Sequence, residues 1–167
     1  MSFIIKKATK SDAAKMLEFL KRVGGETDNL TFGKEGVSTT IQEEAKYIEK
    51  QENSSDGVML IAKENEEIVG TASLTRYPRR MSHRGDFSVS VIREHWNKGI
   101  GRELAEQIIA FAKTNNFEII DLQVRSDNRA AIHLYEKLGF EKIGTHPFFF
   151  KIDGQNVPFD YMCLKIK

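Results

Sequence analysis

The segment VIREHWNKGIGREL (residues 91–104) places two glycines, Gly99 and Gly101, one residue apart, with Lys98 before them and Arg102 after them. Apolar residues recur at helical spacing beyond this segment, so the glycines fall in the first turn of a predicted helix. Glycine in a helix is less favourable than alanine by about 1 kcal/mol, because it loses more conformational freedom. Either an anionic ligand approaches the main chain closely here, or the chain needs a tight turn between a strand and a helix.

The flanking residues predict a strand before the glycines and a helix after them. DFSVSVI (86–92) alternates apolar and polar residues, as a half-buried strand does. The helix ends near 114–116, and its predicted apolar face consists of Leu104, Ile108, Phe111 and Ala112. The free N–H groups and the dipole at a helix N-terminus attract anions, and glycines remove the Cβ atoms that would keep a phosphate away. The arrangement therefore predicts a pyrophosphate site.

The glycine loop has three alternative interpretations: a P-loop, a dinucleotide-binding loop or a turn that binds no ligand. The P-loop pattern G-x-x-x-x-G-K-[ST] is absent. A dinucleotide fingerprint requires a third glycine where Leu104 stands, and Asp121, at the expected spacing, lies inside the next predicted strand. A turn that binds no ligand stays open, because two glycines alone are a weak signal.

Three further helices are predicted from apolar spacing and end signals. The first covers residues 11–25, capped by Thr9 or Ser11 and stopped by the glycine pair at 24–25. The second begins after Thr40, which forms a capping box with Glu43, and carries an apolar face of Ile41, Ala45 and Ile48. The last follows Ser126 or Asp127 as cap and stops at Gly139.

Strands are predicted at 3–8, at 119–124, near 140–144, at 158–166, and as a hairpin over 58–76 that turns at Asn65–Glu67. The order is β-α-α-β-β-β-α-β-α-β-β, an α/β (α+β) domain over residues 1–167 with a mixed, mostly antiparallel sheet of about seven strands and four helices. Between the last two strands, HPFFFKIDGQNVPF (146–159) holds four phenylalanines around a glycine-containing turn. Packing within a hairpin is the first expectation, and a lid over a substrate or a dimer contact is the second.

Composition narrows the class of protein. The 167 residues carry 25 basic and 24 acidic side chains, which gives no support to a nucleic-acid or membrane-surface binder. No apolar run is long enough to cross a bilayer, and the first residues are too weakly apolar for a secretory signal, so we expect a cytoplasmic protein. Cys163 is the only cysteine, and the four histidines show no metal-ligand spacing, so no metal is expected.

The segment that contains the glycines, together with LQVRSDNRAAIHLYEKLGF (122–140), resembles the GNAT superfamily of N-acetyltransferases. In that family a [QR]-x-x-G-x-[GA] loop after the fourth strand binds the pyrophosphate of acetyl-CoA, and an N-x-x-A-x-x-L-Y-x-x-x-G-F segment follows. The second motif is matched position by position by Asn128, Ala131, Leu134, Tyr135, Gly139 and Phe140. Trp96 departs from the first motif, which has Gln or Arg at that position.

The resemblance implies that acetyl-CoA lies between the fourth and fifth strands, its pantetheine arm mimicking a strand. The main chain of Val89 and Val91 would bond that arm, and Asn128 would contact it. The predicted phosphate loop consists of Trp96, Asn97, Lys98, Gly99, Ile100, Gly101 and Arg102. Tyr135 would contact the cofactor and act as general acid toward the departing thiolate.

A base must remove a proton from the amine, whose pKa is otherwise near 10.4. Asp86, at the start of the fourth strand, is the candidate base; Glu94 and His83 are alternatives, and each of these groups could simply meet solvent. His83 and Arg84 end the basic loop RYPRRMSHR (76–84), which either is a solvated surface or binds substrate.

The resulting hypothesis is an enzyme that transfers an acetyl group from acetyl-CoA to a primary amine by direct attack in a ternary complex. The acceptor stays open between a small-molecule amine and an amine of a peptide or protein. A non-catalytic acyl-CoA sensor or an interaction module of the same fold is the alternative. A homodimer through the late strands is an expectation from the family alone.

Overall fold

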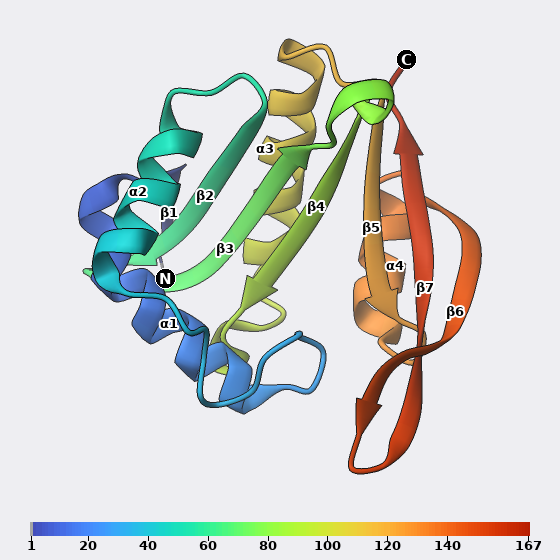
Figure 1. Ribbon diagram of the computed structural model, residues 1–167, viewed down its shortest axis with the longest axis horizontal. Coiled ribbons are helices and arrows are strands. Elements are labelled where there is room, and N and C mark those ends of the chain that lie inside the picture. The colour runs from blue at the N-terminus through green and yellow to red at the C-terminus, as the bar shows by residue number, and fades with distance from the viewer. Residues whose placement is uncertain (1) are drawn as a thin grey trace.

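The computed structural model describes residues 2–167 and places seven strands in one sheet of order β1-β2-β3-β4-β5-β7-β6 (Figure 1). All neighbouring strands are antiparallel except β4 and β5, which are parallel. The strands are β1 (Ile4–Lys7), β2 (Gly57–Glu64), β3 (Glu67–Arg76), β4 (Arg84–Val91), β5 (Ile119–Arg125), β6 (Glu141–Ile152) and β7 (Gln155–Lys165).

Four α-helices cover the sheet: α1 (Ala13–Glu26), α2 (Ile41–Glu52), α3 (Ile100–Thr114) and α4 (Arg129–Lys137). Figure 1 shows α1 and α2 in front of the strands β1 to β3, while α3 and α4 lie behind the sheet. No α-helix within residues 2–167 lies in front of β4, β5 and β7 in that view. The predicted fold class and element order are therefore confirmed.

The alternation of side chains along each strand defines two faces of the sheet. Phe87 of β4 contacts the ring of Tyr135 in α4, so odd-numbered residues of β4 point to the back face. Even-numbered residues of β4, such as Asp86, then point to the front face, the one that bears α1 and α2. The back of the core is filled from α3 by Leu104, Ile108 and Ala112, each 0% exposed as its helical spacing predicted.

Two predicted helix ends are wrong for identifiable reasons. The glycine pair at 24–25 does not stop α1, which runs through Glu26. A Cβ at Gly24 would lie 2.2 Å from the Gly33 carbonyl oxygen, so this glycine lets the following loop cross the helix closely. Helix α4 is capped by Asn128, one or two residues later than predicted, because its side-chain oxygen accepts the Ala131 N–H.

The capping box of Thr40 and Glu43 is confirmed, with backbone-to-side-chain bonds of 3.1 and 3.0 Å. Ile41, predicted to face the core, is 53% exposed. Strand β4 begins two residues earlier than predicted, at Arg84.

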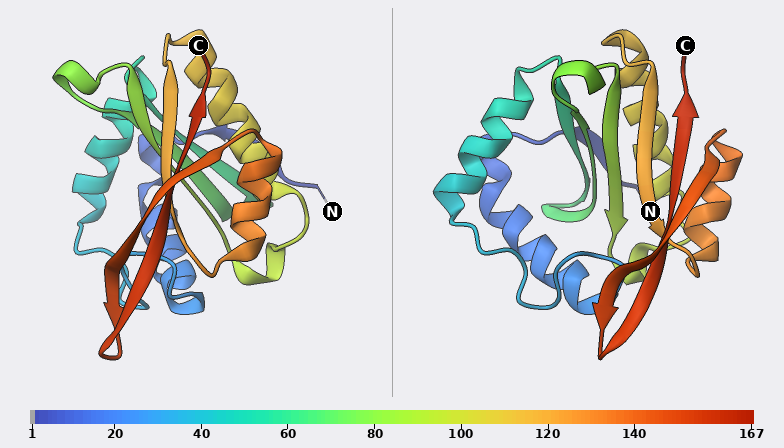
Figure 2. Two further views of the ribbon diagram at one scale, coloured as in Figure 1. Left: turned by 90° about the vertical axis from the view of Figure 1, so that its right-hand side faces the viewer. Right: turned by 45° about the vertical axis from the view of Figure 1, so that its right-hand side comes forward.

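Strand β6 is much longer than the predicted 140–144, and β7 begins three residues before the predicted 158. The two strands form a twisted hairpin whose far end projects past the rest of the sheet (Figure 2). The two strands are joined by Asp153 and Gly154, which both have positive φ, as tight hairpin turns require. Pro147 lies in the part of β6 that was not predicted, and proline cannot donate to a ladder.

None of the helices in residues 2–167 is both long enough and apolar enough to cross a bilayer.

Candidate active site

The site is built on the point where the parallel strands β4 and β5 separate. Their ladder holds only the pairs Arg84↔Ile119, Gly85↔Ile120 and Asp86↔Asp121. Beyond these pairs both strands continue, β4 to Val91 and β5 to Arg125, without bonding each other. The facing edges of the two strands therefore present main-chain groups to whatever lies between them.

Strand alternation shows which groups of β4 face this divergence. The N–H of Ile92, the residue after β4, donates to the Val69 carbonyl of β3 at 3.0 Å. Because successive residues point their main-chain groups to opposite edges, those of Val89 and Val91 face β5. The Trp96 indole N–H donates a hydrogen bond to the Val91 carbonyl at 2.7 Å. The exposed edge of β4 therefore ends at Trp96.

The predicted phosphate loop starts helix α3, and its two glycines serve different purposes. Gly99 is the N-cap residue of α3 with a φ of 83°, a left-handed conformation that glycine adopts without strain. Asn97 is also left-handed, with a φ of 61°. No side chain caps α3, and nothing lies within 4 Å of a Cβ built on Gly99. The N–H groups of the first turn thus have no side-chain cap, and Gly99 adds no side chain beside them, as an anion site requires.

Gly101 leaves room at the mouth of the divergence. A Cβ at this position would lie 3.8 Å from Val91 of β4 and 3.9 Å from Leu134 of α4, an ordinary contact with both. A side chain here would fill the space between the strand edge and α4 without disturbing the fold. The glycine thus keeps open the passage from the helix N-terminus to the edge of β4.

The other members of the loop contribute in different ways. Ile100 is buried, so only its main chain can meet a ligand. The Arg102 guanidinium lies on the surface and pairs with Glu106 at 2.9 Å, one helical turn along. The mouth of the loop thus combines main-chain donors with positive charge.

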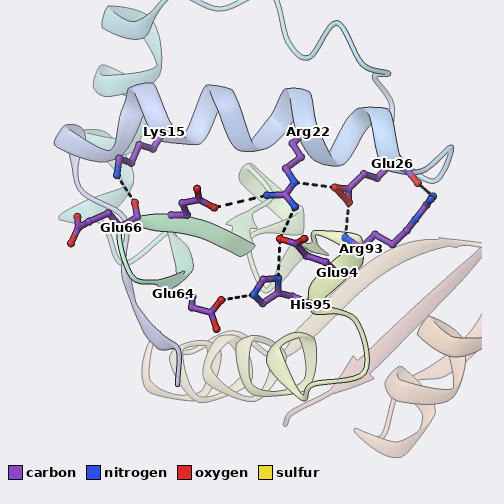
Figure 3. A network of polar contacts seen from close by, with 9 residues as sticks. Lys15, Arg22, Glu26, Glu64, Glu66, Arg93, Glu94 and His95 are labelled. Atoms are coloured by element: carbon purple, nitrogen blue, oxygen red, sulfur yellow. Dashed lines mark hydrogen bonds and ion pairs between the residues drawn. The ribbon is translucent and has the colours of Figure 1, made fainter. Parts of the chain in front are cut away.

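The segment that leads into this loop is tied to helix α1 (Figure 3). The Arg93 N–H donates to the Glu26 carboxylate at 2.5 Å, and its guanidinium donates to the Glu26 carbonyl. The next residue, Glu94, pairs with Arg22 at 2.7 Å. Together these contacts, which we call the α1 brace, fix the end of β4 against the end of α1.

His95 extends this anchoring to β2. The ring is buried, and its Nε2 lies 2.8 Å from the Glu64 carboxylate. Its Nδ1, also buried, lies 3.8 Å from the Glu94 carboxylate. Residues 93–96 are thus each fixed to another part of the fold, which positions the phosphate loop that follows.

Tyr135 lies in α4 behind the divergence, packed among aromatic rings. Its ring meets Phe87 edge-to-face at 6.1 Å and Phe140 at 5.8 Å. Burial raises the pKa of the Tyr135 phenol well above its ordinary value, so the group keeps its proton at neutral pH. Asn128, at the start of the same helix, uses its side-chain oxygen to cap it.

Asp86 lies on the front face at the last β4–β5 pair. Burial raises the pKa of its carboxyl, although contacts from Tyr77 and Gln123 favour the charged form. The Tyr77 hydroxyl donates to Asp86 at 3.3 Å. Glu94, the alternative base, pairs with Arg22 in the α1 brace, and this pair lowers its pKa. Geometry therefore favours Asp86 over Glu94 as the acceptor of a proton.

His83 and Arg84 lie at the closed end of the divergence, opposite the phosphate loop. The His83 carbonyl accepts the N–H groups of Glu118 and Ile119, where β5 begins. The Arg84 guanidinium bonds Asp121 at 2.7 Å. The two residues therefore stand at the same end of the site as Asp86.

Sequence reasoning missed the partners of the predicted residues. Tyr77, just after β3, and Gln123 of β5 contact Asp86. Arg22 and Glu26 of α1 contact the segment that precedes the phosphate loop. Only the odd-even pattern of β5 carried a signal, because Gln123 alternates with buried apolar neighbours. No group of three His, Cys, Asp or Glu side chains within residues 2–167 could hold a metal ion.

Comparison with known proteins agrees with this geometry. The profile of the Acetyltransferase (GNAT) family matches residues 29–140. A GNAT-family acetyltransferase from Streptococcus pneumoniae shares 31% identity and a TM-score of 0.95, over 99% of this chain and 100% of that one. The fold of yncA from Salmonella typhimurium, solved with its cofactor acetyl-CoA, is also similar, with 22% identity and a TM-score of 0.86 over 100% and 95% of the two chains.

Among curated proteins, the N-alpha-acetyltransferase RimI of Mycobacterium tuberculosis is 30% identical over 88 residues. That match covers 52% of this chain and 54% of the relative, so the chain spans about half the length of this relative. The family profile covers most of the chain, including β4, the glycine loop, β5 and α4. The chain belongs to the GNAT family of N-acetyltransferases.

Proposed function

We propose that the protein transfers an acetyl group from acetyl-CoA directly to a primary amine, within a complex that holds both substrates. The observation that carries this proposal is the divergence of β4 and β5 beside an uncapped helix N-terminus that two glycines keep open. Acetyl-CoA, when bound, supplies an activated acetyl group on a sulfur leaving group. The acceptor is a small-molecule amine or an amine of a peptide or protein.

The residues present fit the donor. Main-chain N–H groups from Asn97 to Arg102 would hold the phosphates, and the first turn of α3 has no competing side-chain cap. The pantetheine arm would continue past Gly101 and bond the free edge of β4 at Val89 and at the Val91 N–H. Asn128 would meet the arm from the start of α4. The α1 brace holds this assembly in place before the donor arrives.

Two groups on opposite sides of the sheet would handle protons. Asp86, on the front face, would accept a proton from the acceptor ammonium at its carboxylate and so free the nitrogen lone pair for attack. Tyr135, on the back face, would hold its phenolic proton for the sulfur that departs as the new carbon–nitrogen bond replaces the carbon–sulfur bond. His83 and Arg84 would border the acceptor at the closed end of the site.

A thiol-release assay with acetyl-CoA and a panel of amines, amino acids and peptides tests the activity. Tyr135→Phe should lower kcat by about a hundredfold, the usual contribution of a general acid, while CoA affinity measured by calorimetry stays within about twofold. An unchanged kcat would remove Tyr135 from the mechanism. CoA binding without thiol release across the whole panel would favour an acyl-CoA sensor instead.

A further inference from the structure

The hairpin of β6 and β7 carries a cluster of aromatic rings centred on Phe149. The Phe149 ring stacks on Phe159 at 4.3 Å and meets Phe150 at 5.3 Å, His146 at 5.8 Å and Tyr161 at 6.2 Å. We call these five rings the hairpin cluster. Phe149 is only partly buried, so the cluster presents ring surface to its surroundings.

A bulge in β6 sets the direction of Phe149. His146 pairs with Phe159 and Phe150 pairs with Val157, so three residues of β6 stand opposite one residue of β7. The His146 Nδ1 accepts the Phe148 N–H at 3.1 Å and fixes the bulge. Phe148 is 66% exposed, whereas its neighbour Phe149 turns onto the cluster. Bulges of this kind recur next to active sites, where they redirect one side chain.

The hairpin cluster is continuous with the front face at Asp86. Asp86 contacts the Gln123 side chain, Gln123 pairs with Tyr161 across β5 and β7, and the Tyr161 ring meets Phe149. Strand alternation keeps Gln123 and Tyr161 on the same face as Asp86. Asp86 pairs with Asp121, and Asp121 with Cys163, so Tyr161 lies two strand spacings across and two residues along from Asp86, about 12 Å away.

Charges on this face suit an ammonium rather than an anionic group. The hydrogen-bond partners of Asp86 are Tyr77 and Gln123, which are neutral, and the carboxylate of its strand partner Asp121 adds negative charge beside it. The arginines on the same face already have acidic partners: Arg84 bonds Asp121 at 2.7 Å and Arg125 bonds Asp127 at 2.7 Å. The face therefore offers the Asp86 carboxylate, whose hydrogen-bond partners are neutral, for an ammonium and, beyond it, apolar ring surface.

We infer that the acceptor is a primary amine joined by a short linker to an aromatic ring, with its ammonium at Asp86 and its ring against Phe149 and Tyr161. This inference rests on the proposed function, because it names the substrate class of the same site. Offset or edge-to-face contacts with these rings would orient the amine toward the divergence of β4 and β5. An aliphatic amine of similar basicity lacks these contacts, and a polyamine likewise has no ring to pack against Phe149 and Tyr161.

The test compares 2-phenylethylamine, n-butylamine and spermidine as acceptors in the thiol-release assay. The wild-type protein should use 2-phenylethylamine with a kcat/KM at least about tenfold above that of n-butylamine. Phe149→Ala should remove most of this preference by raising the KM for 2-phenylethylamine about tenfold, and Phe149→Leu, which keeps most of the apolar volume, should remove part of it. The KM for acetyl-CoA should not change in either variant.

Phe148→Ala is the matched control, because Phe148 is adjacent in the same bulge yet forms none of the ring contacts found within residues 2–167. It should retain the wild-type preference and melting temperature. Equal use of 2-phenylethylamine and n-butylamine, or a preference for spermidine, would overturn the inference while the acetyltransferase activity stands. Absence of thiol release with every amine would overturn the proposed function and this inference with it.

Discussion

Gly101→Ala should stabilise the free protein and at the same time weaken its binding of CoA. Gly101 lies in the first turn of α3, where alanine is a better helix former than glycine. The added Cβ would lie 3.8 Å from Val91 and 3.9 Å from Leu134, so it meets no steric obstacle in the free protein. It would, however, occupy the passage that the proposed cofactor site needs.

The change in stability is estimated for the free helix, and the change in CoA affinity for the phosphate contact. Replacing glycine by alanine in a helix is worth about 0.5–1 kcal/mol, which corresponds to a rise in Tm of about 1–4 °C for a domain of this size. Displacing a phosphate from one main-chain donor loses a charge-assisted hydrogen bond of about 1.5–3 kcal/mol. That loss predicts a Kd for CoA about tenfold to a hundredfold higher.

Thermal unfolding and calorimetry with CoA measure the two effects on the same sample. Gly99→Ala is the internal control, since its φ of 83° strains any side chain. That variant should lower the Tm, although open space surrounds its Cβ. A Gly101→Ala variant that binds CoA as tightly as the wild type would refute the reasoning that this glycine keeps the passage open.

Three further sets of variants test the proposed base, the loop crossing at Gly24 and the α1 brace. Asp86→Asn should lower kcat by about a hundredfold, because the proposed base is lost. In the wild type the rate should rise with pH through the pKa of Asp86, which burial raises above the ordinary aspartate range. The variant should lack this inflection in its pH–rate profile. The same raised pKa favours the folded state on acidification, so the stability of the wild type relative to this variant should fall as pH rises. Gly24→Ala should lower the free energy of unfolding in urea by about 1–3 kcal/mol, because its Cβ would collide with the Gly33 carbonyl, and an unchanged urea midpoint would contradict the close crossing. Arg22→Gln and Glu94→Gln should each weaken CoA binding severalfold, and the double variant no further; additive losses in calorimetry would show that the pair does not act as a unit.

Prediction from sequence succeeded where the signal is local. Helical spacing, the capping box at Thr40 and the helix stop at Gly139, where φ is positive, depend on residues within a few positions of each other. It failed where a distant segment decided the outcome. Gly24 resembles a helix stop, but in the structure it lies inside α1 and allows the main chain at Gly33 to pass close to the helix. Both strands of the late hairpin were predicted, but the prediction ended β6 near residue 144, whereas pairing with β7 extends it to Ile152.

The sequence by itself determined the element order, the glycine loop at the start of α3 and the motif that places Tyr135 in α4. Only the tertiary structure decided that β4 and β5 part after Asp86, because ladder register depends on both strands and on the helices behind them. The structure alone also brought Gln123 to Asp86 and Glu26 to Arg93, contacts between residues far apart in the chain. Periodicity specifies which face a side chain occupies, whereas long-range packing specifies what that face meets.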